Sequence, residues 1–333
     1  MRKSRMLWGA LLACVFASGQ AVAWGPDGHH TVGAIADRLL KGTNAATQVQ
    51  AILGTLSLQD AAVWPDCAKG VNPKTFVYQG AGHYPECKIY ETPAGEAAMI
   101  DFVRRNSTNC APKAGEETCH KQYHYADVSI AHDHYDASFT GARPDDIVGA
   151  VAAATHVLKG DPAPAPFDIK DKREALLLLA HYVGDIHQPL HVGAVYLNAK
   201  GKRVDPDAGT FDSTTATRGG NQIKVGGSSR NLHATWDAIP ASLKVSHVST
   251  LLTKAKAVPA TTGPVDDWPK SWASETLKQA QTAFVGIKFS SKQGKTWTAT
   301  VPTNYSTTSR PIKETQLTRA GARLAQLLTT IWP

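Results

Sequence analysis

The sequence lacks several features that mark common classes of protein. Beyond residue 23 it has only four cysteines, no internal repeat, and no change of composition that would separate two domains. No segment there contains the ~18 or more consecutive apolar residues that a membrane-spanning helix needs. These absences argue against a membrane span and a repeat architecture. They favour one mainly α domain over residues 24–333, long enough to bury a sizeable core.

The only long apolar stretch stands at the beginning, in "MRKSRMLWGALLACVFASGQAVA". Its basic start, apolar centre and small-x-small ending at Ala21-Val22-Ala23 are typical of a secretory signal peptide over residues 1–23. An alternative is a lipoprotein signal ending at Cys14, although the apolar run before that cysteine would be very short. We therefore expect a secreted or periplasmic protein that starts at Trp24 and forms no stable membrane association.

Charge and cysteine content limit the partners and the redox chemistry. Removing residues 1–23 takes away three basic residues and no acidic ones, which lowers the formal net charge from +7 to +4. This mild excess suits a polyanionic partner without identifying it. In an exported protein the four remaining cysteines are expected to form two disulfides, and three pairings are possible; they are Cys67, Cys87, Cys110 and Cys119.

Helical periodicity of apolar residues dominates the chain. It predicts helices over 31–40, 46–55, 94–105, 145–159, 171–186, 231–243, 268–286 and 315–332. The stretch "DKREALLLLAHYVGD" combines a charged first turn with a leucine run, which is typical of a buried helix. The connector over 199–220 is rich in polar residues and glycine, and could form a mobile rim or hold a short hairpin running into "NQIKV".

Histidine and aspartate recur at a spacing that suits metal binding. His181 and Asp185 lie four residues apart in the buried helix, and so would face the same side, while Pro189 lets His191 turn back toward them. A second helix repeats the His-x-x-x-Asp spacing with His233 and Asp237. One such pair could be an ordinary hydrogen-bonded pair, but the repetition favours metal ligands. Imidazole and carboxylate donors without free thiolates indicate zinc, with manganese less expected.

An ordered set of short motifs resembles the zinc-dependent single-strand-specific nucleases of the S1/P1 family, which share a fold with bacterial zinc phospholipase C. The motifs cover nearly all of the chain after residue 23: "WGPDGH" (24–29), "WPD" (64–66), "HYAD" (124–127), "DDIVGA" (145–150), "HYVGDIHQPLH" (181–191), "GGNQI" (219–223), "NLHATWD" (231–237) and "AGARLAQLL" (320–328). The resemblance implies a single-domain helical fold with a cleft that holds three zinc ions.

The resemblance also implies which residues bind each ion. The first ion would be bound by Asp66, His124, His181 and Asp185. The second would be bound by Trp24, through its amine and carbonyl oxygen, together with His29 and the bridging Asp185. The third would be bound by His191, His233 and Asp237. An α-amino group has a pKa of about 7.7–8 and can lose its proton to a metal, so signal cleavage would complete the second site.

Other residues receive roles in catalysis or substrate binding. Asp66 is expected to orient the attacking water, and Lys69 to contact the phosphate and offset its charge. Tyr125 matches a position where the family stacks a nucleobase on an aromatic ring, and Asp127 matches one that hydrogen-bonds the base edge. Tyr125 could equally be an ordinary core residue. His30, next to His29, is expected to turn away because a helix should begin near Thr31.

These expectations define a monomeric secreted endonuclease that hydrolyses single-stranded RNA and DNA to 5′-phosphorylated products, with 3′-nucleotidase activity on nucleotides. A zinc phospholipase C is the main alternative. Asp237 argues against it, because the phospholipase branch carries glutamate at that position. A third alternative is a zinc-binding or nucleic-acid-binding module without catalysis, but three protein ligands at the third site leave room for water or substrate.

Overall fold

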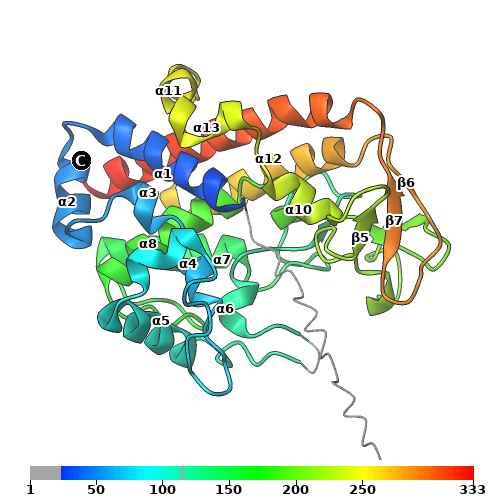
Figure 1. Cartoon of the computed structure of the whole chain (residues 1–333), viewed down its shortest axis with the longest axis horizontal. Coiled ribbons are helices and arrows are strands. Elements are labelled where there is room, and N and C mark those ends of the chain that lie inside the picture. Colours follow the sequence, from blue (N-terminus) through cyan, green and yellow to red (C-terminus); the bar gives the residue numbers. More distant parts are fainter. Residues whose placement is uncertain (1–23, 114–115) are drawn as a thin grey trace, which may run out of the picture.

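The computed structural model describes residues 24–113 and 116–333 (Figure 1), so the proposed signal peptide lies outside it. The described part is mainly helical, as expected. The α-helices are α1 (Pro26–Leu40), α2 (Asn44–Leu53), α3 (Leu58–Ala61), α4 (Trp64–Ala68), α5 (Pro93–Arg105), α6 (Cys119–Gln122), α7 (Ile147–Lys159), α8 (Lys172–Asp185), α9 (Pro189–Val192), α10 (Leu232–Asp237), α11 (Val248–Lys256), α12 (Trp268–Ala283) and α13 (Tyr305–Ile331). No described helix is long and apolar enough to cross a bilayer.

Short strands and 3₁₀ turns complete the chain. The strands are β1 (Val128–Ser129), β2 (Gly193–Ala194), β3 (Tyr196–Leu197), β4 (Arg203–Val204), β5 (Ile223–Val225), β6 (Lys288–Phe289) and β7 (Trp297–Thr300). β5 pairs in parallel with β7, which pairs antiparallel with β6. Figure 1 shows this sheet at the end of the molecule opposite α2. β3 and β4 form a short antiparallel hairpin that begins before the connector over 199–220. The expected hairpin running into "NQIKV" is not formed, because Ile223–Val225 pairs with β7.

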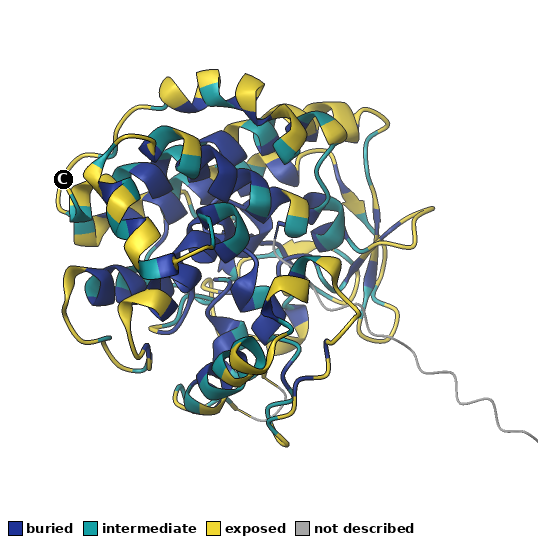
Figure 2. Ribbon diagram, turned by 60° about the vertical axis from the view of Figure 1, so that its left-hand side comes forward, coloured by how far each residue is buried: buried dark blue, intermediate teal, exposed yellow. Residues whose placement is uncertain are grey.

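Helix α8 lies at the centre of the helical core and carries the leucine run. Asp171 caps its first turn, because its side chain accepts a hydrogen bond from the backbone N–H of Glu174. Every residue from Glu174 to Asp185 is buried, and α8 packs against α1, α2, α3, α4, α7 and α13. Figure 2 shows the buried residues concentrated on the helices at the centre of the molecule. Burial of Leu176–Leu179 fixes α8 in the core. The last turns of the helix, which carry His181 and Asp185, are therefore held in place.

Three expected helix boundaries are wrong. Helix α1 begins at Pro26, since proline is favoured in the first turn, and so His29 and His30 lie inside the helix. Helix α10 ends at Asp237, where the chain turns toward Pro240, and does not continue to 243. Helix α13 begins at Tyr305 and includes Pro311. In each case tertiary packing or proline geometry decides the boundary, and apolar periodicity does not report it.

Two disulfides join the four cysteines of the described chain. Cys67 pairs with Cys87, and Cys110 pairs with Cys119. The first bond ties the loop after α4 back onto α4 itself, and the second closes a short loop before α6. Both bonds therefore brace the segments that carry Asp66 and His124.

Candidate metal centre

Helix α8 delivers the central pair of the site. His181 and Asp185 stand one turn apart on its buried last turns, and neither side chain is exposed. His181 donates from Nδ1 to the carbonyl oxygen of Ala62, 2.6 Å away, so Nε2 is the ring nitrogen that faces the site. This pattern, in which the second ring nitrogen is held by a carbonyl, is characteristic of metal-binding histidines.

The carboxylate of Asp185 divides its oxygens between two sets of neighbours. Oδ2 lies 3.0 Å from His181 Nε2 and 2.9 Å from His124 Nδ1. Oδ1 lies 3.3 Å from His29 Nε2 on the other side. Asp66 is near the same atoms, with Oδ1 3.7 Å from His181 Nε2 and 3.9 Å from His124 Nδ1. Asp185 therefore has the geometry of a bridge between two adjacent cation positions.

His29 comes from the first turn of α1 and reaches this group because α1 and α8 approach closely. Gly184 makes the approach possible, since a Cβ atom there would lie 2.9 Å from His29 Nδ1. His30 points elsewhere, and its Nδ1 lies 2.9 Å from the carbonyl oxygen of Gln59. The helix start was wrong, but the choice of His29 over His30 agrees with where the two rings lie.

Trp24 is fully buried beside the same helices. Its indole Nε1 donates to the carbonyl oxygen of Gly184 at 2.9 Å, and the N–H of Gly25 donates to the carbonyl oxygen of Asp237 at 3.0 Å. The residue expected to become the N-terminus is thus fixed between α8 and α10. Its amine and carbonyl remain predicted ligands.

A second group is formed by His191, His233 and Asp237, all buried. Gln188 caps α9 through Leu190 N and turns His191 back toward α8, where its Nδ1 lies 3.8 Å from Asp185 Oδ1. His191 Nδ1 donates to the carbonyl of His124 at 2.6 Å, and His233 Nδ1 donates to the carbonyl of Gly219 at 2.8 Å. Their Nε2 atoms then face each other at 3.1 Å, with His233 Nε2 3.7 Å from Asp237 Oδ2.

This arrangement tests whether the residues fit a metal. Two imidazole nitrogens whose other nitrogens both donate have lone pairs directed at each other, which is repulsive unless a proton or a cation lies between them. Burial opposes the proton, because it lowers the pKa of His191 to about 3 and lowers that of His233 as well. Among the described residues, His29 Nε2 and Asp66 Oδ2 also have no hydrogen-bond partner. The donor set therefore fits cations of the zinc type.

The charge balance of the first group agrees with this conclusion. Burial lowers the pKa of His29 and of His124, which keeps both imidazoles neutral and able to bind a metal. Burial alone would raise the pKa of Asp185, but the neighbouring His181, whose own pKa is raised by Asp185 and Asp66, holds it well below its usual range. Asp185 is thus an ionised carboxylate among histidines.

Lys69 lies beside the cluster. Its Nζ lies 2.8 Å from Asp66 Oδ1, and its side chain is 10% exposed. Burial alone would lower its pKa, but Asp66 and Asp185 raise it above the usual value, so the ammonium keeps its proton. The sequence did not reveal that Lys69 pairs directly with a predicted metal ligand, because only the turn after α4 brings the two side chains together.

Tyr125 and Asp127 lie on the segment that follows His124. The Tyr125 hydroxyl donates to Glu117 Oε2 at 3.2 Å. Burial raises the pKa of Asp127 to about 6. Gly219 lies against Asp127 and has a φ of +56°, and a Cβ atom there would come within 2.4 Å of the Leu190 carbonyl oxygen. A glycine is therefore required where "GGNQI" passes the site.

Gln188 has a role that the sequence did not suggest. Its Nε2 donates to Asp237 Oδ1 at 2.7 Å, which leaves Oδ2 directed toward His233. Its position inside "HYVGDIHQPLH" was the only available signal. His187, from the same motif, instead contacts Arg323, whose Nη1 donates to His187 Nε2 at 3.0 Å.

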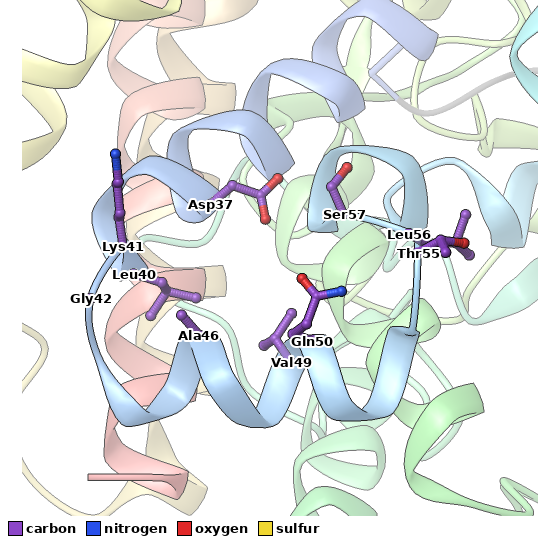
Figure 3. Close-up of a pocket in the computed structure, with 10 residues that line it drawn as sticks. All are labelled: Asp37, Leu40, Lys41, Gly42, Ala46, Val49, Gln50, Thr55, Leu56 and Ser57. Atoms are coloured by element: carbon purple, nitrogen blue, oxygen red, sulfur yellow. The ribbon is translucent and has the colours of Figure 1, made fainter.

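Two other features lie outside this cluster. A cavity of about 330 Å³ opens at the other end of α1, between that helix and α2, and is lined by Asp37, Leu40, Val49 and Ser57 among others (Figure 3). On the surface, His132 Nε2 lies 2.7 Å from Asp207 Oδ2 and 4.0 Å from Asp205 Oδ1. The surface group is a partly exposed hydrogen-bonded cluster, unlike the buried groups around Asp185.

A helical fold around a buried centre of this kind defines a class of metal-dependent hydrolases. Comparison with known proteins narrows the class. The family model described as S1/P1 Nuclease matches residues 24–333. Endonuclease 5 of Arabidopsis thaliana is 25% identical over 332 residues, covering 94% of this chain and 91% of the relative. Endonuclease 4 of the same plant is 25% identical, covering 94% and 90%. Endonuclease 2 is 31% identical over 172 residues, covering 48% and 52%. The chain belongs to the S1/P1 nuclease family, and it is a nuclease.

Proposed function

We propose that residues 24–333 form a single-domain, monomeric, secreted or periplasmic zinc-dependent endonuclease. It cleaves single-stranded RNA and DNA to 5′-phosphorylated products and acts as a 3′-nucleotidase on nucleotides. The observation that carries the proposal is the continuity of the cluster. Asp185 Oδ1 and Oδ2 face His29 and His124 respectively, and His191 Nδ1 lies 3.8 Å from Asp185 Oδ1.

Three zinc ions match this donor set. His124, His181, Asp66 and Asp185 would bind the first, and Trp24, His29 and Asp185 the second. His191, His233 and Asp237 would bind the third. When bound, zinc lowers the pKa of water to ~7 and neutralises charge on a phosphate. This chemistry requires no covalent nucleophile from the protein.

The chain's own residues then position the reacting groups. Asp66 Oδ2 has no hydrogen-bond partner among the described residues and is available to accept a hydrogen bond from the attacking water. Lys69 holds Asp66 Oδ1 and presents a protonated ammonium that can stabilise negative charge developing on the phosphate. Gln188 keeps one oxygen of Asp237 directed at His233, so that both side chains would be available to an ion that neutralises charge on the departing 3′-oxygen.

Tyr125 and Asp127 would recognise one nucleobase next to the cluster. Stacking on an aromatic ring is worth ~1–3 kcal/mol per base and tolerates every base. A base in a duplex must first unstack, at a cost of a few kcal/mol, before it can enter such a site. Preference for single strands follows from this difference.

The proposal is tested with the chain that starts at Trp24. Single-stranded DNA, duplex DNA, RNA, a 3′-nucleotide and phosphatidylcholine are each incubated with the protein, with and without a zinc chelator. We expect chelator-sensitive cleavage of the single strands and of the 3′-nucleotide, with 5′-phosphates on the polynucleotide products. Hydrolysis of phosphatidylcholine alone would favour the phospholipase alternative. No zinc-dependent hydrolysis of any substrate would contradict the enzyme assignment.

A further inference from the structure

Helix α13 contacts the end of α10, beside the metal centre, through a buried lysine. This lysine has no role in the mechanism proposed above. Lys313 is 6% exposed, although lysine is almost never fully buried without a partner. Its Nζ donates to the carbonyl oxygens of Thr235, at 2.8 Å, and Ala238, at 2.7 Å. These carbonyls belong to the end of α10, the helix that carries His233 and Asp237.

The carbonyl groups at the end of a helix have no partner within the helix and must be satisfied from outside. Helix α10 has six residues, so its final turn also holds the ligand Asp237. Lys313 satisfies the carbonyls on either side of that residue, and Gly25 N satisfies the carbonyl of Asp237 itself at 3.0 Å. The Lys313 ammonium and the Gly25 N–H thus both donate to carbonyl oxygens at the end of α10.

Further contacts fix the ammonium in this position. Nζ lies 5.4 Å from the centre of the Trp236 ring, within the range of a cation–π contact. Trp236 Nε1 donates to the hydroxyl of Tyr305, also on α13, at 2.8 Å. Helix α13 therefore contacts α10 through both Tyr305 and Lys313, which lie eight residues apart. The backbone around Asp237 has little freedom to move while Lys313 is in place.

Burying an ammonium costs several kcal/mol unless hydrogen bonds and charge compensate, and an apolar side chain of the same length would avoid that cost. Here the two carbonyl oxygens of α10 and the face of the Trp236 ring supply that compensation.

We propose that Lys313 is a positioning residue for the third zinc site: its ammonium fixes the end of α10 and so holds Asp237 in the geometry that binds the ion with His191 and His233. This inference rests on the proposed function, because it requires a zinc ion at that site. It assigns Lys313 no contact with substrate.

The test measures zinc binding to the chain that starts at Trp24. Wild type, Lys313→Met and Lys313→Arg are equilibrated with buffers of defined free zinc, and bound zinc per chain is counted by elemental analysis. Methionine keeps most of the length of the side chain but removes the charge and the donors. We expect wild type to bind three ions, and Lys313→Met to bind two with unchanged affinity and the third about 10- to 100-fold more weakly, as for other groups that support metal ligands. Excess zinc should restore the activity of this variant.

Lys254→Met is the matched control. Lys254 pairs with Glu314 on the outer face of α13 at 2.6 Å and does not contact α10. We expect this variant to bind three ions like wild type. Thermal unfolding of the zinc-free proteins is measured in parallel, because a lysine that only stabilises the fold would lower the melting temperature without changing the affinity of one ion selectively.

Three zinc ions of wild-type affinity in Lys313→Met would overturn the inference and leave the proposed function intact. Fewer than three ions in wild type would overturn both, and activity without zinc would identify the proposed function as the cause. If Lys313→Met does not fold, the affinity of Lys313→Arg for the third zinc ion tests the inference instead. The guanidinium is larger than the ammonium and its N–H groups lie in one plane, so it cannot take the position of Nζ between the two carbonyl oxygens without shifting the end of α10. The third ion of Lys313→Arg should therefore bind at least about threefold more weakly, and wild-type affinity there would refute the role.

Discussion

Asp185 Oδ1 lies 3.3 Å from Nε2 of His29, a residue 156 positions earlier in the chain, on a different helix. The other oxygen of the same carboxylate faces His181 and His124. One side chain thus joins two groups of ligands, and the most direct experiment on the centre is to change it.

Asp185→Asn keeps the shape of the side chain but removes the charge and one acceptor oxygen. We expect at least one zinc ion per chain to be lost and kcat/KM on single-stranded DNA to fall by at least about 100-fold, because both shared ions lose a ligand. Asp207→Asn is the control, since Asp207 also pairs with a histidine, His132, at 2.7 Å but lies outside the cluster. Three bound ions with normal turnover in Asp185→Asn would contradict the bridging role.

The N-terminal amine of Trp24 can be tested without a side-chain substitution. A chain that carries one methionine before Trp24 has an amide at that nitrogen, which cannot donate its lone pair to a metal. We expect this chain to bind one zinc fewer and to be at least about tenfold less active than the chain starting at Trp24. Removing the methionine with an aminopeptidase should restore both properties. Equal zinc content and activity before and after removal would exclude the amine as a ligand.

Lys69→Met separates the two possible actions of Lys69. If the ammonium stabilises charge on the phosphate, kcat should fall about 10- to 100-fold while zinc content stays the same. If it acts only by holding Asp66 Oδ1, at 2.8 Å, zinc content should fall together with kcat. Lys121→Met is the control, because Lys121 is a partly buried lysine near Lys69 without a carboxylate ligand of the cluster as its partner.

Asp127 should make nucleotide binding depend on pH. Burial raises its pKa to about 6, so the side chain is a neutral acid below that pH and a carboxylate, which only accepts hydrogen bonds, above it. We expect the KM for 3′-nucleotides to rise about tenfold in wild type as the pH falls from 7 to 5, relative to Asp127→Asn, which cannot ionise. Steady-state kinetics of both proteins over this range provides the measurement. Dividing the KM of wild type by that of Asp127→Asn at each pH cancels pH effects on the zinc ligands that both proteins share. If this ratio does not change with pH, Asp127 has no role in base recognition.

His120 should weaken the protein in acid. It is buried, neither ring nitrogen has a hydrogen-bond partner among the described residues, and burial lowers its pKa to about 3. The unfolded chain takes up the proton near pH 6.5 and the folded chain does not, so stability is lost as the pH falls from about 6.5 toward 3. This loss is about 2 kcal/mol at pH 5.

His120→Leu should remove that loss. Urea unfolding of the zinc-free proteins at pH 7.5 and pH 5 should show a drop in the free energy of unfolding that is about 2 kcal/mol smaller in the variant than in wild type. His247→Leu, at an exposed position, serves as the control. The same drop in wild type and His120→Leu would show that His120 does not contribute to acid sensitivity.

Much of the site could be predicted from local spacing. His181 with Asp185 and His233 with Asp237 are four residues apart, and a helix places such residues on one face whatever surrounds it. The leucine run in α8 predicted a buried helix by its composition alone, and that helix is buried throughout. The choice of His29 needed the motif, because spacing by itself could not separate it from His30.

The remaining features could not be predicted, because they depend on contacts between distant segments. Apolar periodicity missed the start of α1 at Pro26 and the end of α10 at Asp237, where proline and the docking of neighbouring segments decide. It gave no signal for Gln188 or Lys313, whose hydrogen bonds reach residues 49 and 75 or more positions away. Polar residues inside helices look alike in sequence until packing selects their partners.

The sequence by itself determined which side chains could bind a metal, through helical spacing and through the chemistry of imidazole and carboxylate. Only the tertiary structure decided that they meet. Burial of α8 among its neighbouring helices brings His29, Asp66 and His124 to the two oxygens of one aspartate, because hydrophobic packing fixes the separation of helices that are far apart along the chain.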